Sequence, residues 1–104
     1  MISQNEIQKI VAHIRDVAHP SHIYIFGSYA NGSAREESDL DIAVIKHDVV
    51  DAMSEIVSMK RGVISADYSI DILLFTEAEF FADKEHTSVV IDEIKEHGKL
   101  VHAA

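Results

Sequence analysis

Two short apolar runs, joined by a loop of small and polar residues, place the strongest constraint on the fold of this chain. The stretch reads IFGSYANGSAREESDLDIAV over residues 25–44. The segments from His22 to Phe26 and from Asp39 to Lys46 are short and rich in β-branched or aromatic residues, which predicts two strands. Between them, residues 27–38 are expected to form a loop or a short helix, because small and polar residues dominate there.

The rest of the chain reads as helices around one further strand. Apolar residues at helical spacing predict three longer helices, over Ser3–Ala18, Val49 to about Ile64 and Thr87–His97. A third strand is predicted over Tyr68–Phe75, and a capping box predicts a short helix from Thr76. The positions expected to face the core of the three longer helices are Ile7, Ile10, Val11, Ile14 and Val17, then Val49, Met53, Ile56, Val57 and Lys60, then Val90, Ile91 and Ile94. Residues 99–102 are either a short strand or a tail.

This element order predicts the fold class. The order is αβ(α)βαβαα, and the strands are almost continuously apolar, as in a sheet that helices cover. We therefore predict an α/β fold with a small mixed sheet flanked by helices. The length of 104 residues fits one domain over residues 1–104, and there is no internal repeat or long linker to divide it.

The composition argues against several classes of protein. The net charge of −9 opposes binding to duplex nucleic acid, whose phosphates are contacted mainly by Lys and Arg. No apolar run reaches the length of a membrane span, and the polar first residues do not resemble a signal peptide. With no cysteine, a disulfide framework and a thiolate metal site are excluded, and a cytoplasmic location is expected.

Asp39 and Asp41 are the first candidate site residues. Because side chains on a strand alternate between its two faces, both aspartates project to the same side. Two ionised carboxylates on the same side of one strand lie near enough to repel each other. A divalent cation between them would turn the repulsion into attraction. Taken alone the pair is a weak signal, since an acidic chain contains such pairs by chance, and a solvent-exposed strand end would also explain it.

Asp71 strengthens this interpretation, because it interrupts the otherwise apolar stretch SIDILLF. Burying an unpaired carboxylate there would be expensive, so the alternatives are a basic partner, an exposed position or a cluster with other acidic residues. If the two acidic strands are neighbours, Asp39, Asp41 and Asp71 form one group. Such a group suits two Mg²⁺ ions that hold the attacking and leaving oxygens of a displacement reaction.

Gly27 and Ser28 are the second set of candidate site residues, because they could bind an anion such as phosphate. Glycine lets a backbone approach a phosphate closely, and N–H groups at a turn bind anions. The Ser28 hydroxyl adds a donor. By itself, a Gly-Ser pair is equally consistent with an ordinary turn that leaves a strand.

Together these residues resemble the nucleotidyltransferase superfamily that includes DNA polymerase beta, and most of all its minimal prokaryotic members. The hallmark is Gly-Ser, a ten-residue gap, Asp-x-Asp and a third carboxylate on a later strand. Gly27-Ser28, Asp39-Leu40-Asp41 and Asp71 match it, and the resemblance covers roughly residues 22–75. Further residues that fit the loop pattern of the family are Ala30, Gly32, Ala34, Arg35 and Ser38.

The resemblance implies a reaction and its site. Asp39, Asp41 and Asp71 would bind Mg²⁺, with Asp71 also serving as general base, while Gly27 and Ser28 would hold the terminal phosphates of the nucleotide. The reaction would transfer AMP from ATP to a hydroxyl group and release pyrophosphate.

The resemblance also implies a partner. Minimal nucleotidyltransferases are commonly paired with a helical HEPN protein, a ribonuclease toxin that the transferase neutralises by adenylylating a tyrosine. The acidic charge of this chain would complement such a partner. Two alternatives stay open: a free-standing transferase acting on a small hydroxyl compound such as an antibiotic, and a non-catalytic antitoxin that masks its partner. The non-catalytic alternative is supported by Asn31, which occupies a position where family members often have arginine.

Overall fold

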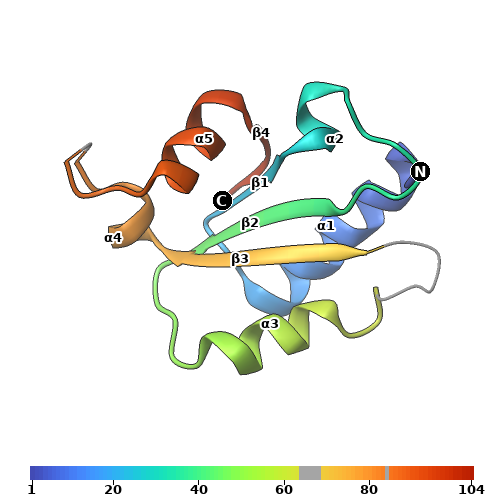
Figure 1. Cartoon of the computed structure of the whole chain (residues 1–104). Coiled ribbons are helices and arrows are strands. Elements are labelled where there is room, and N and C mark those ends of the chain that lie inside the picture. Colours follow the sequence, from blue (N-terminus) through green and yellow to red (C-terminus); the bar gives the residue numbers. More distant parts are fainter. Residues whose placement is uncertain (64–68, 84) are drawn as a thin grey trace.

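The chain builds a β-sheet with helices on both of its faces (Figure 1). The computed structural model describes residues 1–63, 69–83 and 85–104. In these residues the elements are α1 Gln4–Ala18, β1 His22–Phe26, α2 Ser28–Asn31, β2 Leu40–Lys46, α3 Ala52–Lys60, β3 Ile70–Thr76, α4 Glu77–Phe80, α5 Val89–His97 and β4 Lys99–Ala103. Within the same residues, no helix is long and apolar enough to cross a membrane. The predicted α/β class is confirmed.

The sheet is mixed, as the sequence predicted. Its strand order is β3-β2-β1-β4 among the described residues. β1 runs antiparallel to both β2 and β4, whereas β2 and β3 are parallel. The parallel pair needs a crossover connection, which α3 provides. Residues 99–102, which the sequence left as a strand or a tail, belong to β4 at the edge of the sheet.

The alternation of side chains along each strand divides the core between the two faces of the sheet. The first face packs against α1 and α3, and the second packs against α4 and α5. The buried core of the first face is formed by Ile2, Ile7, Ile10, Ile14, Ala18, Ile23, Ile25, Leu40, Ile42, Val44, Met59, Ile70 and Ile72. The buried core of the second face is smaller and contains Ala43, Ile45, Phe80, Ile91 and Ile94.

The first helix agrees closely with its prediction. Ser3 is its N-cap, and the predicted capping box with Glu6 is present. Its buried face includes Ile7, Ile10 and Ile14, but the prediction for Val17 is wrong, because Val17 is exposed and its neighbour Ala18 is buried instead. Successive helix residues point about 100° apart, so Val17 lies at the edge of the face that Ile7, Ile14 and Ala18 share.

The predicted bounds of α3 are wrong. The helix begins at Ala52 rather than Val49, because the Asp51 side chain accepts a hydrogen bond from the Ser54 amide and caps the helix there. Its predicted apolar face is also wrong at Met53 and Val57, which are exposed, while Met59 is buried. The predicted end near Ile64 lies outside the described residues.

The predicted bounds of the last helix and of the third strand also change. α5 begins at Val89 rather than Thr87, since the Ser88 side chain caps it by accepting from the Ile91 amide. Val90, expected inside, is exposed, whereas Ile91 and Ile94 are buried as predicted. β3 runs from Ile70 to Thr76, and the predicted start at Tyr68 lies outside the described residues.

We predict that Phe80 stabilises the second face far more than its neighbour Phe81. Phe80 is fully buried, with its ring 5.3 Å from the Tyr24 ring and 5.8 Å from the Phe75 ring, whereas Phe81 is 50% exposed. Phe80→Ala should lower the free energy of unfolding by about 3–5 kcal/mol. Urea denaturation of both alanine variants measures this difference, and equal losses for Phe80→Ala and Phe81→Ala would contradict it.

Candidate active site

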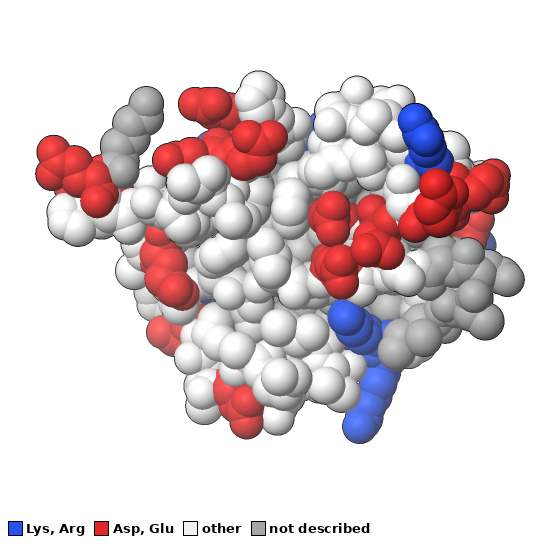
Figure 2. Space-filling view, in the orientation of Figure 1, with Lys and Arg blue, Asp and Glu red and all other residues white. Residues whose placement is uncertain are grey.

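The three candidate aspartates lie where β2 and β3 begin. Asp41 on β2 is directly beside Asp71 on the parallel strand β3. Both project to the second face of the sheet, because they alternate with residues buried on the first face. Asp39 comes one residue before β2, so the predicted strand start at Asp39 is wrong by one residue. Figure 2 shows acidic side chains gathered over this end of the two strands.

The electrostatics of Asp41 indicate that its carboxylate is affected by burial and by the charges of Asp71 and Asp39. The pKa of Asp41 is raised above its usual value, first by partial burial, then by the charge of Asp71 and then by that of Asp39. Asp39 and Asp71 are themselves exposed. Asp71 forms no ion pair with a basic residue among those that the structure describes, and it is exposed beside Asp41.

Gly27 brings the turn after β1 into contact with this group. Its backbone has φ of +71°, a conformation that residues with a side chain rarely adopt. A Cβ atom built on Gly27 would lie only 2.3 Å from Oδ2 of Asp41. Glycine is thus required here by backbone conformation and by space. The turn and the Asp41 carboxylate are close neighbours, as a site that brings a nucleotide phosphate to a metal would need.

Ser28 and Asn31 occupy the single turn of α2. Ser28 is partly buried, and its backbone oxygen accepts a hydrogen bond from the Ser33 amide at 3.1 Å. The Asn31 side-chain oxygen accepts from the Ser33 amide at 3.0 Å and from the Ser33 hydroxyl at 2.6 Å. Arginine has no acceptor atom and could not make these two bonds. Asn31 therefore has a structural role in closing the loop.

Sequence reasoning missed Leu73 near the site, and it considered Tyr29 without finding its long-range contact. Leu73 follows Asp71 by two residues on β3, so both project to the same face, and Leu73 is 37% exposed. The alternation of side chains along β3 could have indicated that Leu73 lies on the same face as Asp71. Tyr29, next to Ser28, is partly buried, and its hydroxyl accepts a hydrogen bond from the Ile2 amide at 3.0 Å. Nothing in the local sequence reveals that long-range contact.

The donor set fits Mg²⁺ by its chemistry. Carboxylate oxygens are the protein ligands that Mg²⁺ prefers, and a cation would relieve the repulsion that raises the pKa of Asp41. In the described part of the chain, no three His, Cys, Asp or Glu side chains already stand in an arrangement that could hold a metal ion. Mg²⁺ is commonly held by one or two carboxylates, with water and substrate phosphates as its other ligands.

Asp39 and Asp71 lie exposed at the surface, as far as the described residues show. A cavity of about 240 Å³ is present, but Lys46 and Met59, which line it, belong to the first face of the sheet. The carboxylates project to the opposite face. Asp71, on the outer strand β3, is exposed in the described part of the chain.

We predict that removing one charge from the acidic group stabilises the metal-free protein. Because the pKa of Asp41 is raised, the folded state favours its neutral form, and the stability that this form provides is lost as the pH rises through the folded pKa. Asp41→Asn mimics the neutral form and should raise the melting temperature at neutral pH by about 2–4 °C. The gain should disappear in acid, where wild-type Asp41 is itself protonated.

Thermal melting at several pH values measures this gain, with Asp83→Asn as a control that removes the same charge from an exposed position far along the chain. A gain that is the same at every pH, or that Asp83→Asn reproduces, would contradict the prediction.

Comparison with solved structures places the fold among known proteins. The chain is similar to a crystal structure of a toxin–antitoxin with AMP-PNP, at 26% identity and a TM-score of 0.72, over 96% of this chain and 74% of that one. It is similar to an MntA-HpeT toxin–antitoxin mutant, at 25% identity and a TM-score of 0.68, over 93% and 73% of the two chains. A third similar structure is the tri-AMPylated Shewanella oneidensis HEPN toxin in complex with MNT antitoxin, at 25% identity and a TM-score of 0.64, over 97% and 72%.

The family comparison covers nearly the whole chain. A search of curated proteins found no significant match. The family model described as Polymerase beta, Nucleotidyltransferase matches residues 5–103. The fold and the resemblance predicted from the sequence are thereby confirmed, and this chain belongs to the polymerase beta nucleotidyltransferase family.

Proposed function

We propose that this chain transfers AMP from ATP to a hydroxyl group, and that the acceptor is a tyrosine of a HEPN-type toxin. The observation that carries the proposal is the register of β2 and β3, which sets Asp41 beside Asp71 while Gly27 contacts Asp41 from the turn. Nucleotide transfer is what the family does. The similar structures with AMP-PNP and with a tri-AMPylated HEPN toxin support the choice of nucleotide and partner.

In the proposed reaction the acidic group has two tasks. Asp39, Asp41 and Asp71 would hold Mg²⁺, which when bound neutralises the charge that develops on the phosphate oxygens. Asp71 would also take the proton of the acceptor hydroxyl. The hydroxyl oxygen then forms a bond to the α-phosphorus of ATP, the bond between that phosphorus and the bridging oxygen breaks, and pyrophosphate leaves.

The turn after β1 has the complementary task of holding the phosphates that leave. With no side chain, Gly27 allows the backbone to approach a phosphate closely. Among the described residues the Ser28 hydroxyl has no hydrogen-bond partner, so it can donate to a phosphate oxygen. Because the turn contacts Asp41, phosphates held by Gly27 and Ser28 would lie next to the metal ligands.

The exposed side chain of Leu73 supports a tyrosine, rather than a small polyhydroxylated compound, as the acceptor. It offers an exposed apolar surface on the same face as Asp71, at the outer strand of the sheet. The ring of a tyrosine could rest on this surface while its hydroxyl reaches the Asp71 carboxylate. A polyhydroxylated small molecule would instead place polar groups against leucine and lose hydration there.

The central test is nucleotide transfer to a partner protein. The chain is co-expressed with the product of the neighbouring gene, supplied with ATP and Mg²⁺, and the partner is weighed by mass spectrometry. We expect the partner mass to increase by whole adenylate units, and the increase to vanish in the Asp39→Asn, Asp41→Asn double variant. The double variant Asp16→Asn, Asp83→Asn, which removes two exposed carboxylates elsewhere, should keep full transfer.

Two outcomes would contradict the proposal. The first is a partner whose toxicity is neutralised but whose mass never changes. The second is neutralisation that survives the double change at Asp39 and Asp41 with folding intact, which would favour the non-catalytic antitoxin. Transfer to small hydroxyl compounds without any partner would favour the free-standing enzyme instead.

A separate prediction tests the acceptor surface. Leu73→Asn should raise the KM for the tyrosine acceptor about three- to tenfold and leave the KM for ATP unchanged, because a leucine surface buried against a ring contributes about 1 kcal/mol. Leu100→Asn is the matched control, since Leu100 is 52% exposed on β4 at the opposite edge of the sheet. An equal rise in both KM values, or an effect of Leu100→Asn of the same size, would contradict a role for Leu73 in binding the acceptor.

A further inference from the structure

The turn at Gly27 and Ser28 has little stability of its own. α2 is a single helical turn, Ser28–Asn31, and none of its residues is fully buried. Its internal bonds run from the Ala30 amide and the Asn31 amide to the Gly27 oxygen, at 3.0 and 3.2 Å. A helix this short is unstable in isolation, because forming the first turn orders several residues for very few hydrogen bonds. Contacts with the rest of the chain must therefore hold it in place.

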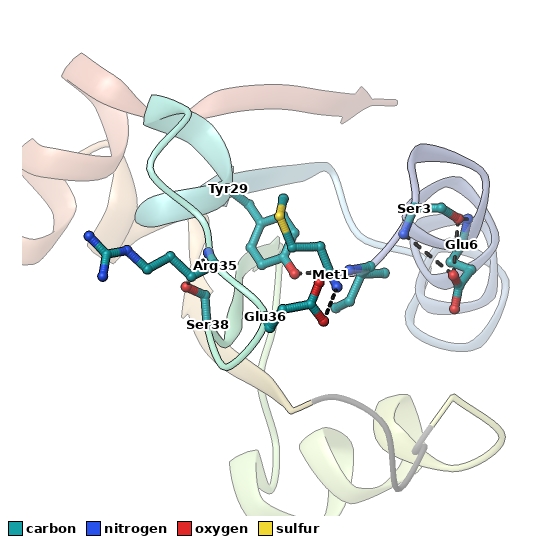
Figure 3. A network of polar contacts seen from close by, with 8 residues as sticks. Met1, Ser3, Glu6, Tyr29, Arg35, Glu36 and Ser38 are labelled. Atoms are coloured by element: carbon teal, nitrogen blue, oxygen red, sulfur yellow. Dashed lines mark hydrogen bonds and ion pairs between the residues drawn. The ribbon is translucent and has the colours of Figure 1, made fainter.

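Tyr29 makes the strongest of these contacts. Its ring packs against the core of the first face, and its hydroxyl accepts a hydrogen bond from the Ile2 amide at 3.0 Å. Ile2 is 5% exposed and belongs to the same core, just before α1. Figure 3 shows the Tyr29 hydroxyl directed toward the N-terminal segment. Tyr29 therefore links the turn to a fixed part of the fold.

The other contacts of this region are weaker or local. The N-terminal amino group of Met1 pairs with Glu36 at 3.1 Å, but the side chains are 50% and 88% exposed, and ion pairs of this kind contribute little (Figure 3). The Ser38 hydroxyl accepts from the Arg35 amide at 2.8 Å, which closes the loop on itself without attaching it to the core. Among the described residues, Tyr29 thus joins the segment between β1 and β2 to the core by both ring packing and a long-range hydrogen bond.

We propose that Tyr29 is a positioning residue, which fixes the turn at Gly27 and Ser28 by anchoring it through the Ile2 amide. That the fixed turn serves phosphate binding rests on the proposed function, whereas the anchoring is a property of the chain without nucleotide. The fit between Gly27 and Asp41 is tight, since a single added carbon would overlap the carboxylate. A turn free to shift by an ångström would change the space in which phosphate and carboxylates meet.

A direct contact of Tyr29 with the nucleotide base does not agree with this geometry. The ring is packed against the core of the first face, while Asp41 and Asp71 project to the second face. The hydroxyl oxygen accepts from the Ile2 amide, which places it against the N-terminal segment. Tyr29 therefore acts through the turn and not on the substrate.

Hydrogen exchange of the chain without nucleotide tests the anchor. Tyr29→Phe keeps the ring and removes the hydroxyl, so the Ala30 and Asn31 amides should exchange about three- to tenfold faster, as expected for the loss of one hydrogen bond. Tyr24→Phe is the matched control, because it removes the same group from a ring that packs against Phe80 in the other core. Unchanged exchange at the turn, or equal acceleration in β1 and β2, would overturn the inference.

Binding of Mg·ATP, measured by titration calorimetry, then connects the anchor to the site. We expect Tyr29→Phe to weaken binding about three- to tenfold and Tyr24→Phe to leave it unchanged. Binding of equal strength by Tyr29→Phe and the wild type would overturn the positioning role. A wild-type chain that binds no Mg·ATP would overturn the proposed function, while the exchange rates would still decide whether Tyr29 anchors the turn.

Discussion

The parallel pairing of β2 with β3 is the constraint on which the rest of the structure depends. Its register sets Asp41 directly beside Asp71, and the crossover through α3 exists because parallel strands cannot be joined by a short turn. The same pairing places two like charges on adjacent strands, an arrangement that opposes folding. Structural needs alone would favour an uncharged residue at one of the two positions, and this cost supports the proposal that the acidic pair has a functional role.

The two faces of the sheet differ in how much of their surface helices cover. The first face carries the larger core, because α1 and α3 cover strand residues that are almost all isoleucine, leucine or valine. The second face carries a smaller core under α4 and α5, and its remaining part holds Asp41, Asp71 and the exposed Leu73. A small chain can leave charged residues uncovered on one face because burial on the other supplies most of the hydrophobic stabilisation.

The sequence predicted the elements well where local rules decide them. The capping boxes at Ser3 and Thr76 and the short apolar strands needed no knowledge of distant residues. The errors at Val17 and Val90 arise because a helix turns by about 100° per residue, and only packing against the sheet selects which of two neighbouring apolar residues is buried. The nearness of Asp71 to Asp41 likewise depends on strand pairing between distant segments, so a sequence pattern could suggest it without establishing it.

The contact between Gly27 and Asp41 has a consequence for how this chain can vary. A side chain at position 27 meets two independent obstacles, the left-handed backbone and the carboxylate 2.3 Å from where its Cβ would lie. Shortening or removing the side chain at position 41 would clear the space but leave the backbone strain, and it would also delete a carboxylate. A single change at position 41 would therefore relieve only one of the two obstacles to a larger residue at position 27, so the two positions constrain each other.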